Sequence, residues 1–339
     1  MLRPDVSVVI VSHNGFELTH ACVSSILRNT HEVSYEIIVV DNASTDGTPQ
    51  SLLQMFPSTR VIVNNVNIGY GAACNQGMRA ANGRYVMILN NDTEVLDGAL
   101  ANLAKILDHR SDIGVVAPKL LNPDRTIQPS ISRFPSLIPI MIRQIVPASI
   151  VEQRGILRLI RWTARGLGIN IGRLDEYVHS TEVECPMGSA FMIRRKVIEE
   201  VGMFDAQRFF LFTEEADWFY RIRNAGWKIY YTVDATALHH RHQSVNRYKY
   251  RYLIQQHKSL LQYFEKHSSV SFVLTYKLLV GMIVFAKATF HAMLSMFSGS
   301  KRLDHQRSFE AYKTILNFFV NRNLRNRNVM REWQFKYIE

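Results

Sequence analysis

Two short stretches of this 339-residue chain carry side chains that suit metal binding and acid–base catalysis. In the first, Asn90, Asn91 and Asp92 directly follow residues 85–89, an apolar run typical of a strand buried on both faces. Ligands bind beyond the carboxyl ends of strands in open α/β sheets, so these oxygen-bearing side chains favour a hard cation or a polar ligand. An ordinary turn is the alternative, because Asn and Asp also form turns.

The second stretch is the acidic segment that contains Glu214, Glu215 and Asp217. Thr213 is a suitable N-cap, which places both glutamates in the first turn of a helix. A helix amino terminus favours ionised carboxylates, and an ionised carboxylate can remove a proton from a hydroxyl group. The alternative is an acidic first turn that serves only the helix dipole.

Alternating strand and helix patterns position these two stretches. Buried strands are predicted at residues 6–12, 35–40, 60–63, 85–89 and 113–117, with two later strands at 228–232 and 236–238. Helical segments separate the early strands. This order favours a doubly wound, mainly parallel sheet.

Polar residues end three successive strands, at residues 12–14, 41–44 and 90–92. In a parallel sheet these ends meet at one edge, where a nucleotide would bind. The first turn, Ser-His-Asn-Gly, lacks the GxGxxG sequence of a dinucleotide site, which disfavours an oxidoreductase.

Four motifs in order carry a resemblance to a known family. They are Val-Ser-Val-Val-Ile-Val-Ser-His-Asn-Gly, Val-Val-Asp-Asn-Ala-Ser-Thr-Asp-Gly, Asn-Ile-Gly-Tyr-Gly-Ala-Ala-Cys-Asn-Gln-Gly and Asn-Asn-Asp-Thr-Glu. Over residues 5–245 the chain resembles the family-2 glycosyltransferases of the GT-A fold, particularly the bacterial rhamnosyltransferase-like branch. The resemblance implies an inverting transferase that uses a nucleoside-diphosphate sugar of the UDP or dTDP type.

The resemblance also implies roles for individual residues. Asp41 matches the aspartate that binds the pyrimidine base, and Asp92 matches the last residue of the D-x-D motif, which binds Mg²⁺ or Mn²⁺. The other residues matched to donor binding are Ser12, Asn14, Asn67, Gly69, Asn75, Asn90 and Asn91. Asn90 replaces a carboxylate of the motif, and an amide oxygen there can point at the cation or at the sugar.

The later part of the resemblance concerns the acceptor side. Gly188 and Ser189 match a strand that forms the floor between donor and acceptor, where glycine permits close approach of the backbone. Glu215 matches the general base, with Glu214 as the alternative and Asp217 in support. A histidine of the family completes the metal site. His239 fits its spacing, while His240 and His242 stay open.

The excess positive charge lies in the last third of the chain. Residues 245–339 hold 16 Lys and Arg against 5 Asp and Glu, whereas residues 1–244 hold 24 of each. The apolar segment 272–297 is interrupted by Lys277 and Lys287, which favours an interfacial helix over a spanning one. We therefore expect a GT-A catalytic domain at 1–245 and a basic, membrane-associating helical extension at 246–339. A helix pair that packs on its own core or in a homodimer is the alternative.

An apolar and arginine-rich insertion at residues 135–173 also suits a membrane surface, and an ordinary solvated insertion is equally compatible. Three scattered cysteines and the absence of a basic, apolar leader indicate a cytoplasmic start. We expect the protein on the inner face of the plasma membrane, with a lipid-linked glycan acceptor and no nucleic acid partner. The rival functions are a sugar nucleotidyltransferase and a catalytically silent scaffold on the membrane.

Overall fold

The computed structural model describes residues 3–145, 177–240, 249–297, 299 and 301–321. The chain divides into two compact units, which we describe separately. The first consists of Met1–Phe134, Gly172–Phe210 and Glu214–Gln243, and the second of Pro135–Ile171, Leu211–Thr213 and Ser244–Glu339. Most of the predicted insertion, and the turn that contains His242, lie outside the described residues.

A nine-stranded sheet forms the centre of the first unit, with the strand order β3-β2-β1-β4-β10-β6-β11-β5 and β8 paired to β11. Strands β1 to β4 are parallel, β6 is parallel to β11, and β10 runs antiparallel between β4 and β6. The strands are β1 (Val6–Ser12), β2 (Tyr35–Asp41), β3 (Arg60–Val63), β4 (Tyr85–Asn90), β5 (Thr93–Val95), β6 (Ile113–Leu121), β8 (Thr181–Glu182), β10 (Ala190–Arg194) and β11 (Lys228–His239). Strands β7 (Ile131–Ser132) and β9 (Cys185–Pro186) form a separate pair.

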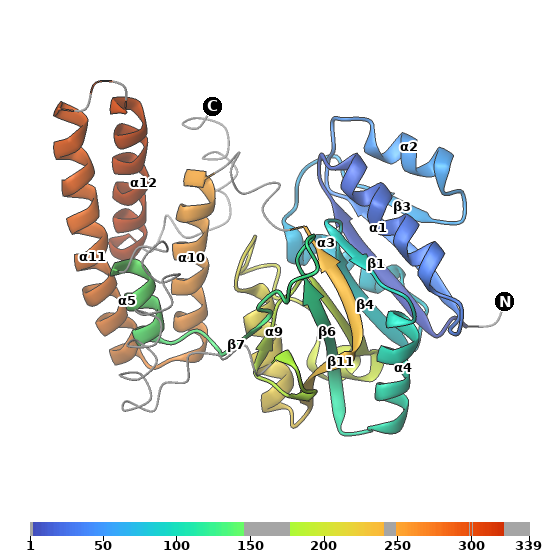
Figure 1. Cartoon of the computed structure of the whole chain (residues 1–339). Coiled ribbons are helices and arrows are strands. Elements are labelled where there is room, and N and C mark those ends of the chain that lie inside the picture. Colours follow the sequence, from blue (N-terminus) through green and yellow to red (C-terminus); the bar gives the residue numbers. More distant parts are fainter. Residues whose placement is uncertain (1–2, 146–176, 241–248, 298, 300, 322–339) are drawn as a thin grey trace. The chain divides into compact units, whose positions relative to one another are not determined.

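Helices cover both faces of this sheet (Figure 1). On one face, α1 (Phe16–Asn29), α2 (Thr48–Met55) and α4 (Ala99–His109) share a buried apolar cluster with alternate residues of β1 and β4. On the other face lie α3 (Tyr70–Ala80) and α9 (Glu214–Asn224), while α8 (Arg195–Val201) follows β10. Gly77 lets α3 lie close to the sheet, because a Cβ there would be 2.2 Å from Cγ1 of Val9. The layered architecture confirms the predicted α/β class.

Strand β11 differs from the sequence prediction of two separate strands. It is one twelve-residue strand whose register against β6 shifts between Thr232 and Thr236. The shift carries its last residue, His239, to a position opposite Thr93 of β5. A late strand thus delivers a histidine to the segment that follows β4.

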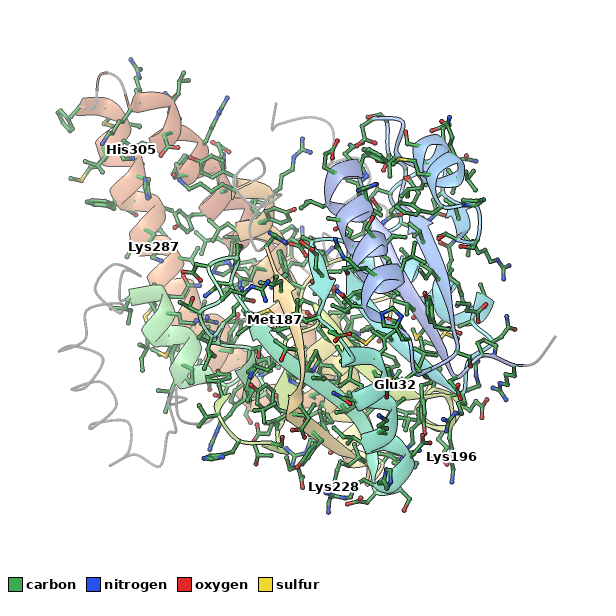
Figure 2. The ribbon with its side chains drawn as sticks, turned by 45° about the vertical axis from the view of Figure 1, so that its right-hand side comes forward. Glu32, Met187, Lys196, Lys228, Lys287 and His305 are labelled. Atoms are coloured by element: carbon green, nitrogen blue, oxygen red, sulfur yellow. The ribbon has the colours of Figure 1, made fainter. Side chains whose placement is uncertain are left out.

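The second unit is helical. Its described helices are α5 (Leu137–Ile145), α10 (Lys249–His267), α11 (Val270–Phe297) and α12 (Arg302–Val320). Helix α11 packs along α12 through one buried face, formed by Val273, Tyr276, Val280, Val284 and Ala288. Figure 2 labels Lys287 on α11 and His305 on α12, on these adjacent helices.

The two lysines that interrupt the apolar sequence of α11 bind neighbouring helices. Lys277 Nζ lies 3.3 Å from Oε1 of Glu265 on α10, and Lys287 Nζ donates to Oε1 of Gln144 on α5 at 3.0 Å. Within the described residues, α11 is the one helix long and apolar enough to cross a membrane by length and composition. Its lysines are held within the helical unit.

Candidate active site

The ends of β1, β2 and β4 lie side by side. Ser12 pairs with Asp41, and Val11 pairs with Asn90 in the parallel ladders. The polar residues after these strands therefore gather at one edge of the sheet, as the sequence pattern predicts for parallel strands.

The turns after β1 and β2 are tied together by Asn14. Its backbone N–H donates to Oγ of Ser44 at 2.8 Å, and its Oδ1 accepts from the backbone N–H of Thr45 at 2.7 Å. Both carboxylate oxygens of the fully buried Asp41 accept from the backbone N–H of Ser44 at 3.1 Å. Asp41 thus acts as a turn former, and its contact with a base stays a prediction.

The glycine-rich motif before and within α3 holds its own loop in place. Oδ1 of Asn67 accepts from the side chain of Asn42 and from the backbone of Gly69, both at 3.0 Å. Gly69 has a φ of 90°, and a Cβ there would lie 2.5 Å from the carbonyl oxygen of Phe210. Its conformation and its close approach both require glycine.

Asn75, which we expected in the donor pocket, is buried and bound to the backbone of Phe204. Its Nδ2 donates to the Phe204 carbonyl at 2.9 Å, and its Oδ1 accepts from the Phe204 N–H at 3.1 Å. Both ends of the amide are used, so Asn75 joins α3 to the segment that leads toward the acidic turn.

The two asparagines of the Asn-Asn-Asp motif have side-chain partners. Oδ1 of Asn90 accepts from the hydroxyl of Tyr70 at 2.8 Å, and Nδ2 of Asn91 donates to Oγ1 of Thr19 at 3.1 Å. The same Thr19 hydroxyl lies 2.8 Å from Oγ of Ser12. Of the side-chain oxygens of this motif, Oδ1 of Asp92 is the one that is buried without a hydrogen-bond partner among the described residues.

Asp92 faces His239. The distance from Asp92 Oδ1 to His239 Nε2 is 3.3 Å, and this buried oxygen has no hydrogen-bond partner among the described residues. Nε2 of His240 instead lies 2.7 Å from Oε1 of Glu94. Of the candidate ligands His239 and His240, which both lie in the described part of the chain, His239 is the one beside Asp92.

The Asp92–His239 pair fits a divalent cation. Neighbouring ligands of an octahedral ion at ~2.1 Å lie ~3 Å apart, close to the observed separation, and Asp92 Oδ1 is an orphaned acceptor. No group of three or more His, Cys, Asp or Glu that could hold a metal occurs within the described residues. A two-ligand site suits Mg²⁺ or Mn²⁺, which take their remaining ligands from phosphate oxygens and water.

The acidic turn has an unusual backbone. Helix α9 begins at Glu214, as predicted, but Phe212 and Thr213 before it have φ values of 67° and 70°. Thr213 is therefore left-handed, whereas an N-cap residue is normally extended. Two consecutive non-glycine residues in this region cost about 1–3 kcal/mol each, and strain of this kind concentrates at functional sites.

Glu214 is buried and its neighbour Glu215 is half-buried. Oε2 of each has no hydrogen-bond partner within the described residues. Burial raises the pKa of both carboxyl groups, and the charge of Glu215 raises the pKa of Glu214 further. Asp217 is different, because its Oδ2 accepts from Nε of Arg221 at 3.0 Å. Arg221 also donates to the carbonyls of Val201 and Met203, so Asp217 helps to tie α9 to the end of α8 and the glutamates are left for chemistry.

Gly188 connects the acidic turn to the edge of the sheet. A Cβ on Gly188 would lie 2.5 Å from Cγ of Glu215, so only glycine leaves room for this glutamate. The carbonyl of Gly188 accepts from the hydroxyl of Tyr70 at 3.4 Å, and the carbonyl of Ser189 accepts from the backbone N–H of Asn90 at 2.8 Å. The acidic turn and the Asn-Asn-Asp motif therefore share one part of the first unit.

Tyr70 is a site residue that the sequence motifs did not indicate. Its hydroxyl contacts both Asn90 and Gly188, the neighbours of Asp92 and Glu215 respectively. Because this bond engages Oδ1 of Asn90, the amide oxygen that we expected at the cation or the sugar is bound to Tyr70. The position of Tyr70 between two motif glycines was the available signal.

Comparison with solved structures establishes the fold. The mannosyltransferase PcManGT from Pyrobaculum calidifontis, in complex with GDP-Man and Mn²⁺, covers 99% of this chain and 89% of its own length at a TM-score of 0.50 and 17% identity. GalNAc-T7 with UDP, GalNAc and Mn²⁺ covers 94% and 57% at a TM-score of 0.55 and 16% identity. The fold is that of the GT-A glycosyltransferases.

Sequence comparison establishes the family. Residues 7–202 match the model for glycosyl transferase family 2, and the chain belongs to this family. It is 29% identical over 267 residues to the N-acetylglucosaminyl-diphospho-decaprenol L-rhamnosyltransferase of Mycobacterium tuberculosis, covering 74% of this chain and 81% of that protein. It is 32% identical over 113 residues to the putative teichuronic acid biosynthesis glycosyltransferase TuaG of Bacillus subtilis, covering 32% and 44%. The chain is a glycosyltransferase, and the predicted family is confirmed.

Replacing Gly188 with alanine should lower kcat by about 10²-fold, because the added Cβ displaces Glu215 and misplaced groups lose catalysis on this scale. Donor affinity should stay near that of the unaltered protein. Steady-state kinetics and donor titration check both. Gly281→Ala is the control, since its Cβ would come no closer than 3.5 Å to Phe319 and should change neither value. An unchanged kcat in Gly188→Ala would show that the space left beside Glu215 by Gly188 is not needed for catalysis.

Replacing Glu214 with glutamine should raise the melting temperature by a few degrees at neutral pH. Burial lifts the pKa of Glu214 above its ordinary value of 4.5, so stability falls as the pH rises from 4.5 through the folded-state pKa. The neutral variant avoids this loss, and melting curves across pH should diverge on the alkaline side. Glu199→Gln, at an exposed position, is the control. A melting temperature lowered at all pH values contradicts the interpretation.

Proposed function

We propose that this glycosyltransferase moves a sugar, with inversion, from a UDP- or dTDP-linked donor to a hydroxyl of a lipid-linked glycan during the synthesis of a cell-surface polysaccharide. The observation that carries the proposal is the close approach of Glu215 to Gly188. Gly188 lies at the same edge of the sheet as the Asp92–His239 pair. Inverting transfer needs a base on one side of the sugar and charge stabilisation on the other.

Glu215 is the proposed general base. It is partly exposed, whereas Glu214 is almost fully buried with 2% of its surface exposed, so Glu215 is the glutamate better placed to meet an acceptor. A raised pKa strengthens a carboxylate as a base, provided that it is ionised at the working pH. The charge of Glu215 raises the pKa of Glu214, so Glu214 is the glutamate that stays protonated, and Asp217 is paired with Arg221.

Asp92 and His239 are the proposed cation ligands, in agreement with the Mn²⁺ found in both structural relatives. A divalent cation there would supply positive charge to the departing diphosphate. Asn90 and Asn91 hold the strand end in position through Tyr70 and Thr19. The donor sugar would then lie between this strand end and Glu215.

The mycobacterial relative supports a proposal for the sugar and the acceptor. Its name describes transfer of L-rhamnose to an N-acetylglucosaminyl diphosphate on a decaprenol lipid. We infer a hexose or deoxyhexose donor for this chain, with rhamnose as the first candidate, and a lipid-linked acceptor. With such an acceptor, the proposed site of the reaction is the inner face of the plasma membrane.

A row of apolar side chains on α11 is the proposed membrane contact. These side chains are 54% to 77% exposed and follow one face of the helix: Val270, Leu274, Leu278, Met282, Phe285, Met293 and Met296. Helix α12 exposes charged groups that hydrocarbon would exclude, among them Arg302, Glu310 and Lys313. We infer that α11 lies in the membrane surface through this row and that the pair does not cross the bilayer.

Replacing Leu274 and Leu278 together with glutamate should abolish sedimentation with vesicles that contain anionic lipid, because both charges enter the apolar row. Leu53→Glu is the control, since Leu53 is 51% exposed on α2 of the other unit. Sedimentation and size-exclusion chromatography are measured together. Unchanged vesicle binding with loss of a dimer would contradict membrane contact and assign the row to a homodimer.

The rival functions are tested by a screen of nucleotide sugars for transfer and hydrolysis with Mg²⁺ or Mn²⁺. We expect release of a nucleoside diphosphate from one or a few donors. Formation of a nucleotide sugar from a nucleoside triphosphate would instead identify a nucleotidyltransferase. Donor binding without turnover would indicate a catalytically silent scaffold. Asn90, which stands in place of a carboxylate of the motif, is the feature that favours this rival.

A further inference from the structure

Gln128 is a fully buried glutamine beside the Asp92–His239 pair, and no motif singles it out. It follows β6, in the segment that leads to β7. Its side chain spans the gap between Asn122 and His239 and contacts both.

The hydrogen bonds of Gln128 fix the orientation of its amide. One end lies 3.1 Å from the backbone carbonyl of His239 and 2.8 Å from Oδ1 of Asn122. A backbone carbonyl can only accept, so this end must be the amide nitrogen, which donates. The other end is the oxygen Oε1, and it lies 2.7 Å from Nδ1 of His239.

This orientation determines the tautomer of His239. An amide oxygen can only accept, so Nδ1 of His239 must carry the hydrogen. In the neutral ring Nε2 then presents a lone pair, and it faces Asp92 Oδ1 at 3.3 Å. In that neutral ring, Nε2 and Asp92 Oδ1 are two acceptors with no proton between them, and one of them is a buried oxygen without a hydrogen-bond partner among the described residues. Such a pair suits a shared cation.

We propose that Gln128 is a positioning residue that holds His239 in the Nδ1–H tautomer, so that Nε2 serves with Asp92 as a ligand of the divalent cation. This inference rests on the proposed function for the cation itself. Partners of this kind orient a metal-bound histidine and increase its basicity, and their loss typically costs ~10–100-fold in metal affinity.

Two measurements test the role of Gln128. Nitrogen-15 NMR of the metal-free protein above neutral pH should show His239 as the Nδ1–H tautomer. Electron paramagnetic resonance of Mn²⁺, with UDP present, should show affinity reduced by ~10–100-fold in Gln128→Met, together with a mixed His239 tautomer. The NMR result on the unaltered protein needs no variant, so it decides the tautomer even if Gln128→Met fails to fold.

Matched variants separate positioning from general loosening of the loop. Asn122→Ala removes one acceptor of the Gln128 amide but leaves the bond between Oε1 and Nδ1, and His240→Gln changes the neighbouring histidine. Both should keep the Mn²⁺ affinity and the His239 tautomer. An Nε2–H tautomer in the unaltered protein, or full affinity in a folded Gln128→Met, would overturn the inference. No Mn²⁺ binding by the unaltered protein would instead refute the cation in the proposed function, while the tautomer result stands separately.

Discussion

Replacing Glu215 with glutamine should lower kcat by ~10²–10⁴-fold while donor binding is kept, because the amide cannot accept the proton of the acceptor hydroxyl. The side chain keeps its size and so still fits against Gly188. In the unaltered protein, burial raises the pKa of Glu215 above 4.5, so the rate should climb with pH until this group is ionised. The variant should lose this ascending limb.

Single-turnover transfer and donor titration measure the two effects of Glu215→Gln separately. Glu199→Gln, an exposed change on α8, should behave as the unaltered protein. Transfer by Glu215→Gln at the full rate would show that the base lies elsewhere, and Glu214→Gln would then be the next variant to assay. Loss of donor binding together with the rate would indicate damage to the site and count against a role confined to proton transfer.

Replacing Asp92 with asparagine should lower kcat by ~10²–10³-fold and remove the dependence of activity on Mg²⁺ or Mn²⁺. The reason is the charge, since the amide side chain would keep the shape but lose the carboxylate that faces His239. Activity measured against metal concentration gives the result, and Mn²⁺ resonance gives the affinity.

Asp97→Asn is the matched control for Asp92→Asn. Asp97 lies five positions later in the same segment and is exposed, so its change should leave the metal response intact. If Asp92→Asn keeps the metal response of the unaltered protein, other residues hold the cation. The proposal that Asp92 is the metal ligand of the donor site would then be wrong.

The strand ends could be predicted from sequence because local pattern determines them. Five apolar residues followed by Asn90, Asn91 and Asp92 define a buried strand and its polar end without knowledge of any partner. Parallel pairing then brings Ser12, Asp41 and Asn90 to one edge. The fold class and the family followed from these local signals.

The partners of these residues could not be predicted, because they depend on contacts between distant segments. Tyr70 meets Gly188, and Gln128 meets His239, through pairings of strands and loops more than a hundred residues apart. Asn75 gives a second example. Its motif predicts a place in the donor pocket, and in the folded chain its side chain binds the backbone of Phe204. Motif spacing identifies candidate residues, and the folded chain determines what each one touches.

The central claim is that a cation at Asp92 and a base at Glu215 act on opposite sides of one donor sugar. A crystal structure with Mn²⁺ and an unreactive nucleotide sugar, with anomalous diffraction recorded for manganese, tests it most directly. We expect the anomalous peak between Asp92 and His239, with the anomeric carbon of the sugar facing Glu215. A manganese peak away from Asp92, or a sugar that is separated from Glu215 by other side chains, would contradict the account.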